Sequence, residues 1–155
     1  MSMEIDTRFS QKINRYPAVL LICYEMEKLM IEKKEVYYCD KCKNVVESLW
    51  NGKPNLACCG VPMKKLVANT TDAAVEKHVP VIVRDGNKVT VKVGGNPHPM
   101  QADHYILFIE VLAGEKVYRH DFKEGDTVAE ATFLIEEKNL KARAYCNLHG
   151  FWEST

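Results

Sequence analysis

The chain has 155 residues, which is enough for one ordinary domain or two small ones. Lys plus Arg and Asp plus Glu each total 21, so the formal net charge is zero. This balance argues against a nucleic acid or an anionic membrane as partner, because phosphate binding normally needs a marked basic excess. The longest apolar stretch, Pro17–Cys23, is about a third of the roughly 20 residues of a membrane-spanning helix. We therefore expect a cytoplasmic protein, in which six cysteines indicate metal ligands rather than disulfides.

The first segment, residues 1–35, is predicted to be a helical extension. Pro17 suits the start of a helix. The apolar residues that follow it recur at helical spacing, with charges on the opposite face: Val19, Ile22, Cys23, Met26, Leu29 and Met30. We favour a helix that packs on its own domain or on a second subunit, with a docking surface for a partner as the alternative. Cys23 lies on the apolar face and is interpreted as a buried thiol.

The second segment, residues 36–70, carries four cysteines in the pattern Cys39-x-x-Cys42, fifteen residues, Cys58-Cys59. Four thiolates form a tetrahedral site that suits zinc or a single iron. So short a segment buries little core and needs a metal or a partner to hold it. The side chains of adjacent cysteines diverge, so we expect Cys58 and Cys59 to distort the tetrahedron. A structural zinc ribbon is the alternative.

The third segment, residues 71–155, is predicted to form a β-sandwich of short strands. Asp85-Gly86 indicates a hairpin, and Lys88–Val93 has the period-two alternation of a half-buried strand. The predicted strands are Val79–Val83, Lys88–Val93, Tyr105–Leu112, Lys116–Phe122, Val128–Leu134 and Lys141–Cys146.

Four histidines and one cysteine of this segment lie at predicted strand ends or in loops: His78, His98, His104, Cys146 and His149. His98 stands between two prolines, which restrict the backbone around it. Cys146 and His149 have the spacing of a chelating turn. A lone histidine is more often a surface residue than a ligand, but four of the five histidines share this setting. His120, inside a predicted strand beside an acidic residue, is expected to bind nothing.

Four imidazoles and a thiolate are five ligands, so an iron ion that accepts six keeps one position open, as catalysis requires. A thiolate opposite that position increases the electron density available to a bound oxygen species, as at haem iron. Lys77, next to His78, would attract an anion to the open position. A solvated surface charge is the alternative interpretation of Lys77.

These motifs resemble a known family. Tyr37–Leu66, with Tyr38-Cys39-Asp40-Lys41-Cys42 and Cys58-Cys59-Gly60-Val61-Pro62-Met63, resembles desulforedoxin. Asp72–Glu153 resembles the superoxide reductases through Glu76-Lys77-His78-Val79-Pro80, Pro97-His98-Pro99-Met100, His104-Tyr105-Ile106 and Cys146-Asn147-Leu148-His149-Gly150. Together they resemble the desulfoferrodoxins, the two-iron superoxide reductases. The first 35 residues have no counterpart in that pattern, and Phe108 stands where family members often carry Trp.

The resemblance implies a mainly β protein, with a small desulforedoxin- or rubredoxin-like domain followed by an immunoglobulin-like sandwich. It implies one iron bound by Cys39, Cys42, Cys58 and Cys59, and a catalytic iron bound by His78, His98, His104, His149 and, axially, Cys146. Superoxide would be reduced there to hydrogen peroxide, with Lys77 attracting the anion and assisting protonation. Glu76 would take the sixth position on ferric iron. Rubredoxin or a similar donor would restore the ferrous state, and the chain would form a homodimer.

Two other functions remain open from the sequence. One is a rubredoxin-like electron carrier in which the second site is vestigial. The other is a zinc-ribbon module that binds a protein or nucleic acid, although zero net charge and the lack of interleaved aromatic and basic residues disfavour nucleic acid.

Overall fold

The computed structural model describes residues 30–53, 55–71, 78–123 and 125–155. The chain divides between Leu66 and Val67 into two compact units, and every named element in the described residues is a β-strand. Most of the predicted helical extension, residues 1–29, lies outside the described residues. Residues 30–35 are not helical, because the N–H and C=O of Ile31 pair with Gly52 at 3.0 and 2.8 Å. None of the described residues belongs to a helix that could cross a membrane.

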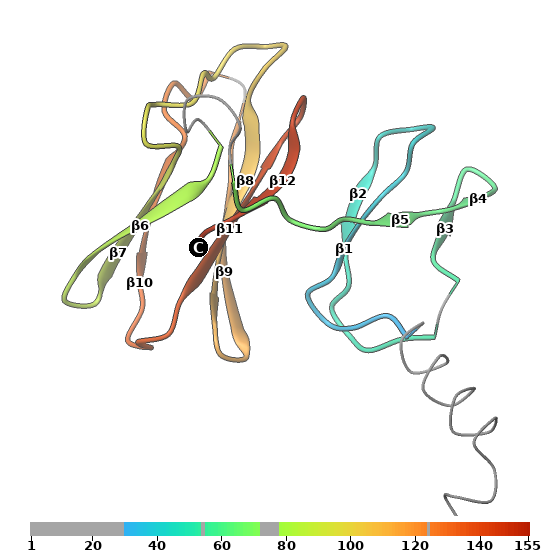
Figure 1. The fold of residues 1–155 in the computed structure, drawn as a ribbon, viewed down its shortest axis with the longest axis horizontal. Coiled ribbons are helices and arrows are strands. Elements are labelled where there is room, and N and C mark those ends of the chain that lie inside the picture. The colour runs from blue at the N-terminus through green and yellow to red at the C-terminus, as the bar shows by residue number, and fades with distance from the viewer. Residues whose placement is uncertain (1–29, 54, 72–77, 124) are drawn as a thin grey trace, which may run out of the picture. The chain divides into compact units, whose positions relative to one another are not determined.

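The first unit contains five very short strands (Figure 1). A three-stranded antiparallel sheet has the order β2-β1-β5, and a separate hairpin joins β3 to β4. The strands are β1 (Val36–Tyr38), β2 (Val45–Glu47), β3 (Ala57–Cys58), β4 (Val61–Pro62) and β5 (Lys64–Lys65). Strands this short cannot build a layered core, so their loops contribute most of the unit.

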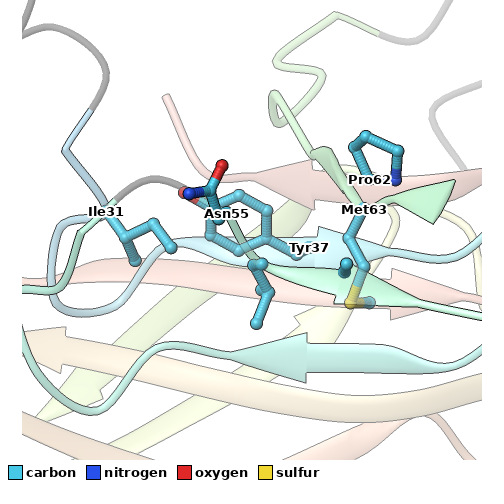
Figure 2. Close-up of a pocket in the computed structure, with 7 residues that line it drawn as sticks. Ile31, Tyr37, Asn55, Pro62 and Met63 are labelled. Atoms are coloured by element: carbon cyan, nitrogen blue, oxygen red, sulfur yellow. The ribbon is translucent and has the colours of Figure 1, made fainter. Parts of the chain in front are cut away.

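The core of the first unit is small and partly open. Its buried cluster consists of Tyr37, Cys39 and Met63, with Ile31, Leu56 and Cys58 packed against it. A cavity of about 260 Å³ borders this cluster, and the side chains of Ile31, Tyr37 and Met63 line it (Figure 2). The small core agrees with the expectation that apolar burial alone does not hold this segment.

The second unit is a sandwich of two antiparallel sheets. One sheet has the order β10-β7-β6 and the other β12-β11-β8-β9, and Figure 1 shows them as separate layers. The strands are β6 (Pro80–Asp85), β7 (Lys88–Val93), β8 (Ile106–Ala113), β9 (Lys116–Asp121), β10 (Glu130–Leu134), β11 (Lys141–Cys146) and β12 (Gly150–Glu153). The six predicted strands are all present, with ends displaced by up to two residues. β12 was not predicted.

Alternating side chains of the two sheets fill the sandwich core. On β7, Val89, Val91 and Val93 are at most 2% exposed, as the period-two pattern predicted. They pack with Ile109 and Val111 of β8 in one cluster. The predicted β6–β7 hairpin is also present, with Gly86 and Asn87 as its two-residue loop and Gly86 at φ +58°.

The buried cluster includes Cys146, at the end of β11. One step along β11, from Tyr145 to Cys146, corresponds to two steps along β8, from Phe108 to Ile106. Leu107 is therefore the extra residue of a β-bulge, and bulges change the direction in which nearby side chains point. This irregularity lies where β11 runs into the loop that carries His149.

Candidate metal centres

The four cysteines of the first unit lie close together at the ends of its loops. Cys39 follows β1, Cys42 closes a turn in which the Lys43 N–H donates to Cys39 O at 2.9 Å, and Cys58 ends β3. The ligand atoms of Cys39, Cys42, Cys58 and Cys59 all lie within 4.8 Å of one another. All five cysteines of the described residues are free thiols.

The backbone of Cys59 explains how two adjacent cysteines face one point. Cys59 has φ +52° and Gly60 has φ +73°, so the chain is left-handed at both. This conformation costs a non-glycine residue about 1–2 kcal/mol, and it turns the Cys59 side chain toward that of Cys58, with 3.8 Å between the sulfurs. The divergence expected from sequence adjacency is therefore offset by a strained backbone, and such strain often marks a functional site.

The sulfur geometry of this cluster fits a tetrahedral ion. Thiolates about 2.3 Å from one ion are about 3.8 Å apart, and the sulfur of Cys58 lies 3.4 Å from that of Cys42 and 3.8 Å from that of Cys59. A hydrogen bond from the Asn44 N–H lowers the pKa of Cys42 to about 7. Contact with Cys42 raises the pKa of Cys59 to about 12. A bound cation would favour the thiolate form of Cys59 against this rise.

The second cluster combines four imidazoles and one thiol in the sandwich unit. His78 precedes β6, and His98 and His104 belong to the loop between β7 and β8. Cys146 is the last residue of β11, and His149 lies in the β11–β12 turn. Their ligand atoms all lie within 4.8 Å of one another. Chain segments that are distant in sequence therefore deliver one compact donor set.

Distances inside this cluster are those of neighbouring ligands on one ion. His149 Nδ1 lies 2.9 Å from His78 Nε2, 3.1 Å from His104 Nε2 and 3.6 Å from Cys146 Sγ. Nitrogens about 2.1 Å from an ion are about 3.0 Å apart when adjacent. A single ring proton cannot serve three such contacts at once, so a shared cation satisfies them better than hydrogen bonds do.

His98 is oriented as a ligand would be. Its Nδ1 lies 2.6 Å from the Pro99 carbonyl, which can only accept, so Nδ1 carries the proton and the Nε2 lone pair is left unprotonated. Nε2 is buried and has no hydrogen-bond partner, although such atoms are normally paired. Burial lowers the pKa of His98 to about 4, against the hydrogen bond to Pro99. A neutral imidazole with an unused, buried lone pair fits a metal ion.

The Cys146 thiol of the cluster is fully buried. Burial raises its pKa, and backbone N–H groups of His149 and Leu148 oppose that rise. The His149 N–H points at Cys146 Sγ from 3.4 Å. These groups are placed to stabilise a thiolate once a cation is bound.

Trp152 of β12 supports two members of the cluster, a role that the sequence did not reveal. Its ring stacks on His78 with centroids 4.8 Å apart and planes at 20°. Its Nε1–H donates to the carbonyl of His149 at 3.1 Å. Trp152 was missed because β12 was missed, and aromatic residues near strand ends are usually core.

Four other residues singled out in the sequence lie outside the two clusters or outside the described residues. Glu76 and Lys77 lie outside the described residues. His120 is exposed on β9, with its ring 4.8 Å from that of Phe122, and belongs to neither cluster. Phe108 is buried, and its ring stacks on Tyr145 with centroids 6.0 Å apart.

Fold and sites together define a mainly β protein with a four-cysteine cluster in a small unit and a four-histidine, one-cysteine cluster in a sandwich. Family models agree: residues 31–66 match "Desulfoferrodoxin, N-terminal domain" and residues 70–155 match "Desulfoferrodoxin". The chain belongs to the desulfoferrodoxin family.

Individual relatives support this membership. A desulfoferrodoxin homolog of Archaeoglobus fulgidus is 50% identical over 125 residues, which cover 81% of this chain and 99% of that protein. A superoxide reductase of Pyrococcus abyssi is 36% identical over 112 residues, covering 59% and 96%. The crystal structure of the superoxide reductase from Treponema pallidum superposes with a TM-score of 0.63 at 25% identity, covering 78% of this chain and 97% of that one.

Proposed function

We propose that this protein is a superoxide reductase that holds two irons, one in each cluster. The observation that supports this best is that the ligand atoms of four imidazoles and one thiol lie within 4.8 Å of one another, in a family whose relatives include proteins named superoxide reductase. The reaction adds one electron and two protons to superoxide and yields hydrogen peroxide. His78, His98, His104, His149 and Cys146 would hold one iron, which in its ferrous state would supply the electron.

The donor set suits an anionic substrate. Four neutral imidazoles and one thiolate leave a divalent ion with a net positive charge, so superoxide is attracted rather than repelled. His98 is neutral without having to lose a proton, because burial keeps its pKa near 4. His149 is exposed and His104 partly exposed, whereas His78, His98 and Cys146 are buried.

Lys77 and Glu76 complete the proposed site. Lys77 adjoins His78 in sequence, and its ammonium group would attract superoxide and assist protonation of the product. Glu76 would supply a carboxylate as a further ligand when the iron is ferric. Both roles come from the family resemblance.

The four-cysteine cluster is proposed to hold the other iron and to exchange electrons with a donor. All its thiolates are used as ligands, so it cannot readily bind substrate. Cys42 and Cys59 are exposed, which supports access by a rubredoxin-like donor. This exposure also favours the second candidate, a pure electron carrier.

The other expectations belong to the same proposal. They are domains at 36–70 and 71–155, an immunoglobulin-like sandwich, a helical segment within residues 1–35, a homodimer and a cytoplasmic location. A reducing compartment is consistent with free thiols at all five described cysteines.

The deciding experiment measures iron and zinc per chain, and the visible spectrum before and after superoxide is added. Two irons per chain, with one ferrous centre oxidised by superoxide and peroxide formed, are expected. His149→Ala should lose the iron of the four-histidine, one-cysteine cluster and keep the four-cysteine iron. A protein that holds only zinc and does not respond would refute the proposal, and electron exchange without iron in the second cluster would favour the carrier.

A further inference from the structure

Asn147 lies between the two chain segments that supply His104, Cys146 and His149, and it is not itself a proposed ligand. It follows Cys146 in the β11–β12 turn. Its side-chain Oδ1 accepts from the Tyr105 N–H at 2.9 Å, and its Nδ2 donates to the Asp103 carbonyl at 2.9 Å. Its own backbone N–H donates to the Tyr105 carbonyl at 3.1 Å. These three bonds engage the residues on either side of His104.

The segment that Asn147 holds is a tight turn. Gln101 and His104 exchange two backbone hydrogen bonds, of 2.9 and 3.0 Å, around Ala102 and Asp103. This turn positions His104 as one unit, so fixing the turn also fixes the imidazole. Asn147 attaches it to the turn that carries Cys146 and His149.

The loop that carries His104 borders a cavity, so it packs against few side chains there. A cavity of about 640 Å³ is lined by Gln101, Ala102 and Tyr105, together with Phe122. Side chains that face a cavity lack partner atoms there. The bonds to Asn147 therefore add a restraint that packing on the cavity side does not supply.

We propose that Asn147 is a positioning residue that sets the place of the His104 imidazole relative to Cys146 and His149. A primary amide suits this task because it offers an acceptor and a donor in fixed geometry. Its Oδ1 faces an N–H and its Nδ2 faces a carbonyl, so the amide orientation is determined by the network. The inference rests on the proposed iron site of the sandwich unit.

Two variants test it. Asn147→Ala leaves the Tyr105 N–H and the Asp103 carbonyl without their partner. Asn147→Asp nearly keeps the shape and the acceptor, but it loses the donor and places a charge near Cys146 Sγ, which lies 3.9 Å from Oδ1. Asn69→Ala is the matched control, because it removes one amide bond, Nδ2 to the Phe151 carbonyl at 3.3 Å, in the same unit.

The measurements are iron retention by the second centre against a chelator, the thiolate-to-iron absorption band, and the melting temperature of metal-free protein. Both Asn147 variants are expected to bind this iron about 10–100-fold more weakly, the usual effect of losing a partner that orients a ligand, and to shift the band. Asn69→Ala should neither weaken iron binding nor shift the band. The four-cysteine iron should be unchanged in all three variants. The near-isosteric Asp variant gives a result even if the Ala variant does not fold.

Three outcomes would overturn the inference, and they can be told apart. If the unsubstituted protein binds no iron in the second centre, the proposed function fails and the inference fails with it. If the unsubstituted protein binds iron there, but Asn147→Asp matches Asn69→Ala in iron retention and absorption, Asn147 has no positioning role. If an Asn147 variant only lowers the melting temperature, with iron retention and the absorption band unchanged, Asn147 stabilises the fold and does not position His104.

Discussion

Trp152 offers a sharp test of the geometry around the proposed catalytic centre. It is 8% exposed, stacks on His78 and donates one hydrogen bond to the His149 carbonyl. Trp152→Phe can keep an aromatic ring over His78 but removes the N–H donor. One such bond contributes about 0.5–1.5 kcal/mol, and the smaller ring adds a packing loss. We therefore expect the free energy of unfolding to fall by about 1–2 kcal/mol.

The matched control is Trp50→Phe, because the chain has two tryptophans and Trp50 is 80% exposed. Its effect should stay within about 0.5 kcal/mol. Urea denaturation and thermal melts of metal-free protein give the comparison, since each kcal/mol lowers the melting temperature by about 4–8 °C in a domain of this size. Equal unfolding free energies for the two variants would refute the assigned contacts of Trp152.

Three further predictions follow from other parts of the molecule. Lys77→Ala should keep both irons but slow the reaction with superoxide, more strongly at low salt; an unchanged rate in a stopped-flow assay removes Lys77 from the mechanism. Glu110, fully buried, receives two bonds from Arg143, at 3.1 and 2.5 Å, so Glu110→Gln should cost about 3–5 kcal/mol in urea denaturation. The exposed control Asp121→Asn should cost less than about 1 kcal/mol, and similar losses would contradict this account. Cys59→Gly should abolish the four-cysteine iron absorption, because the fourth thiolate is lost although glycine accepts φ +52° without strain; an unchanged absorption would remove Cys59 from the ligand set.

The sequence by itself determined the strands of the sandwich core and the residue types at both clusters. Lys88–Val93 alternates because side chains of a strand point to opposite faces, and this local rule needs no knowledge of the rest of the chain. The cysteine pairs and the loop histidines stood out in the same way, since their spacing is a property of short segments. β12 was missed because its four residues form a strand through pairing with β11.

Only the tertiary structure decided how those residues are used. It brings His78 next to His149 across 71 positions of sequence, with Nε2 of one facing Nδ1 of the other. It gives Cys59 a left-handed backbone, and it bonds Asn147 to both neighbours of His104. Sequence spacing limits which residues can meet within one turn or strand. Which ring nitrogen faces the cluster, and which amide or indole holds it there, depends on contacts between distant segments that exist only after the sheets have packed.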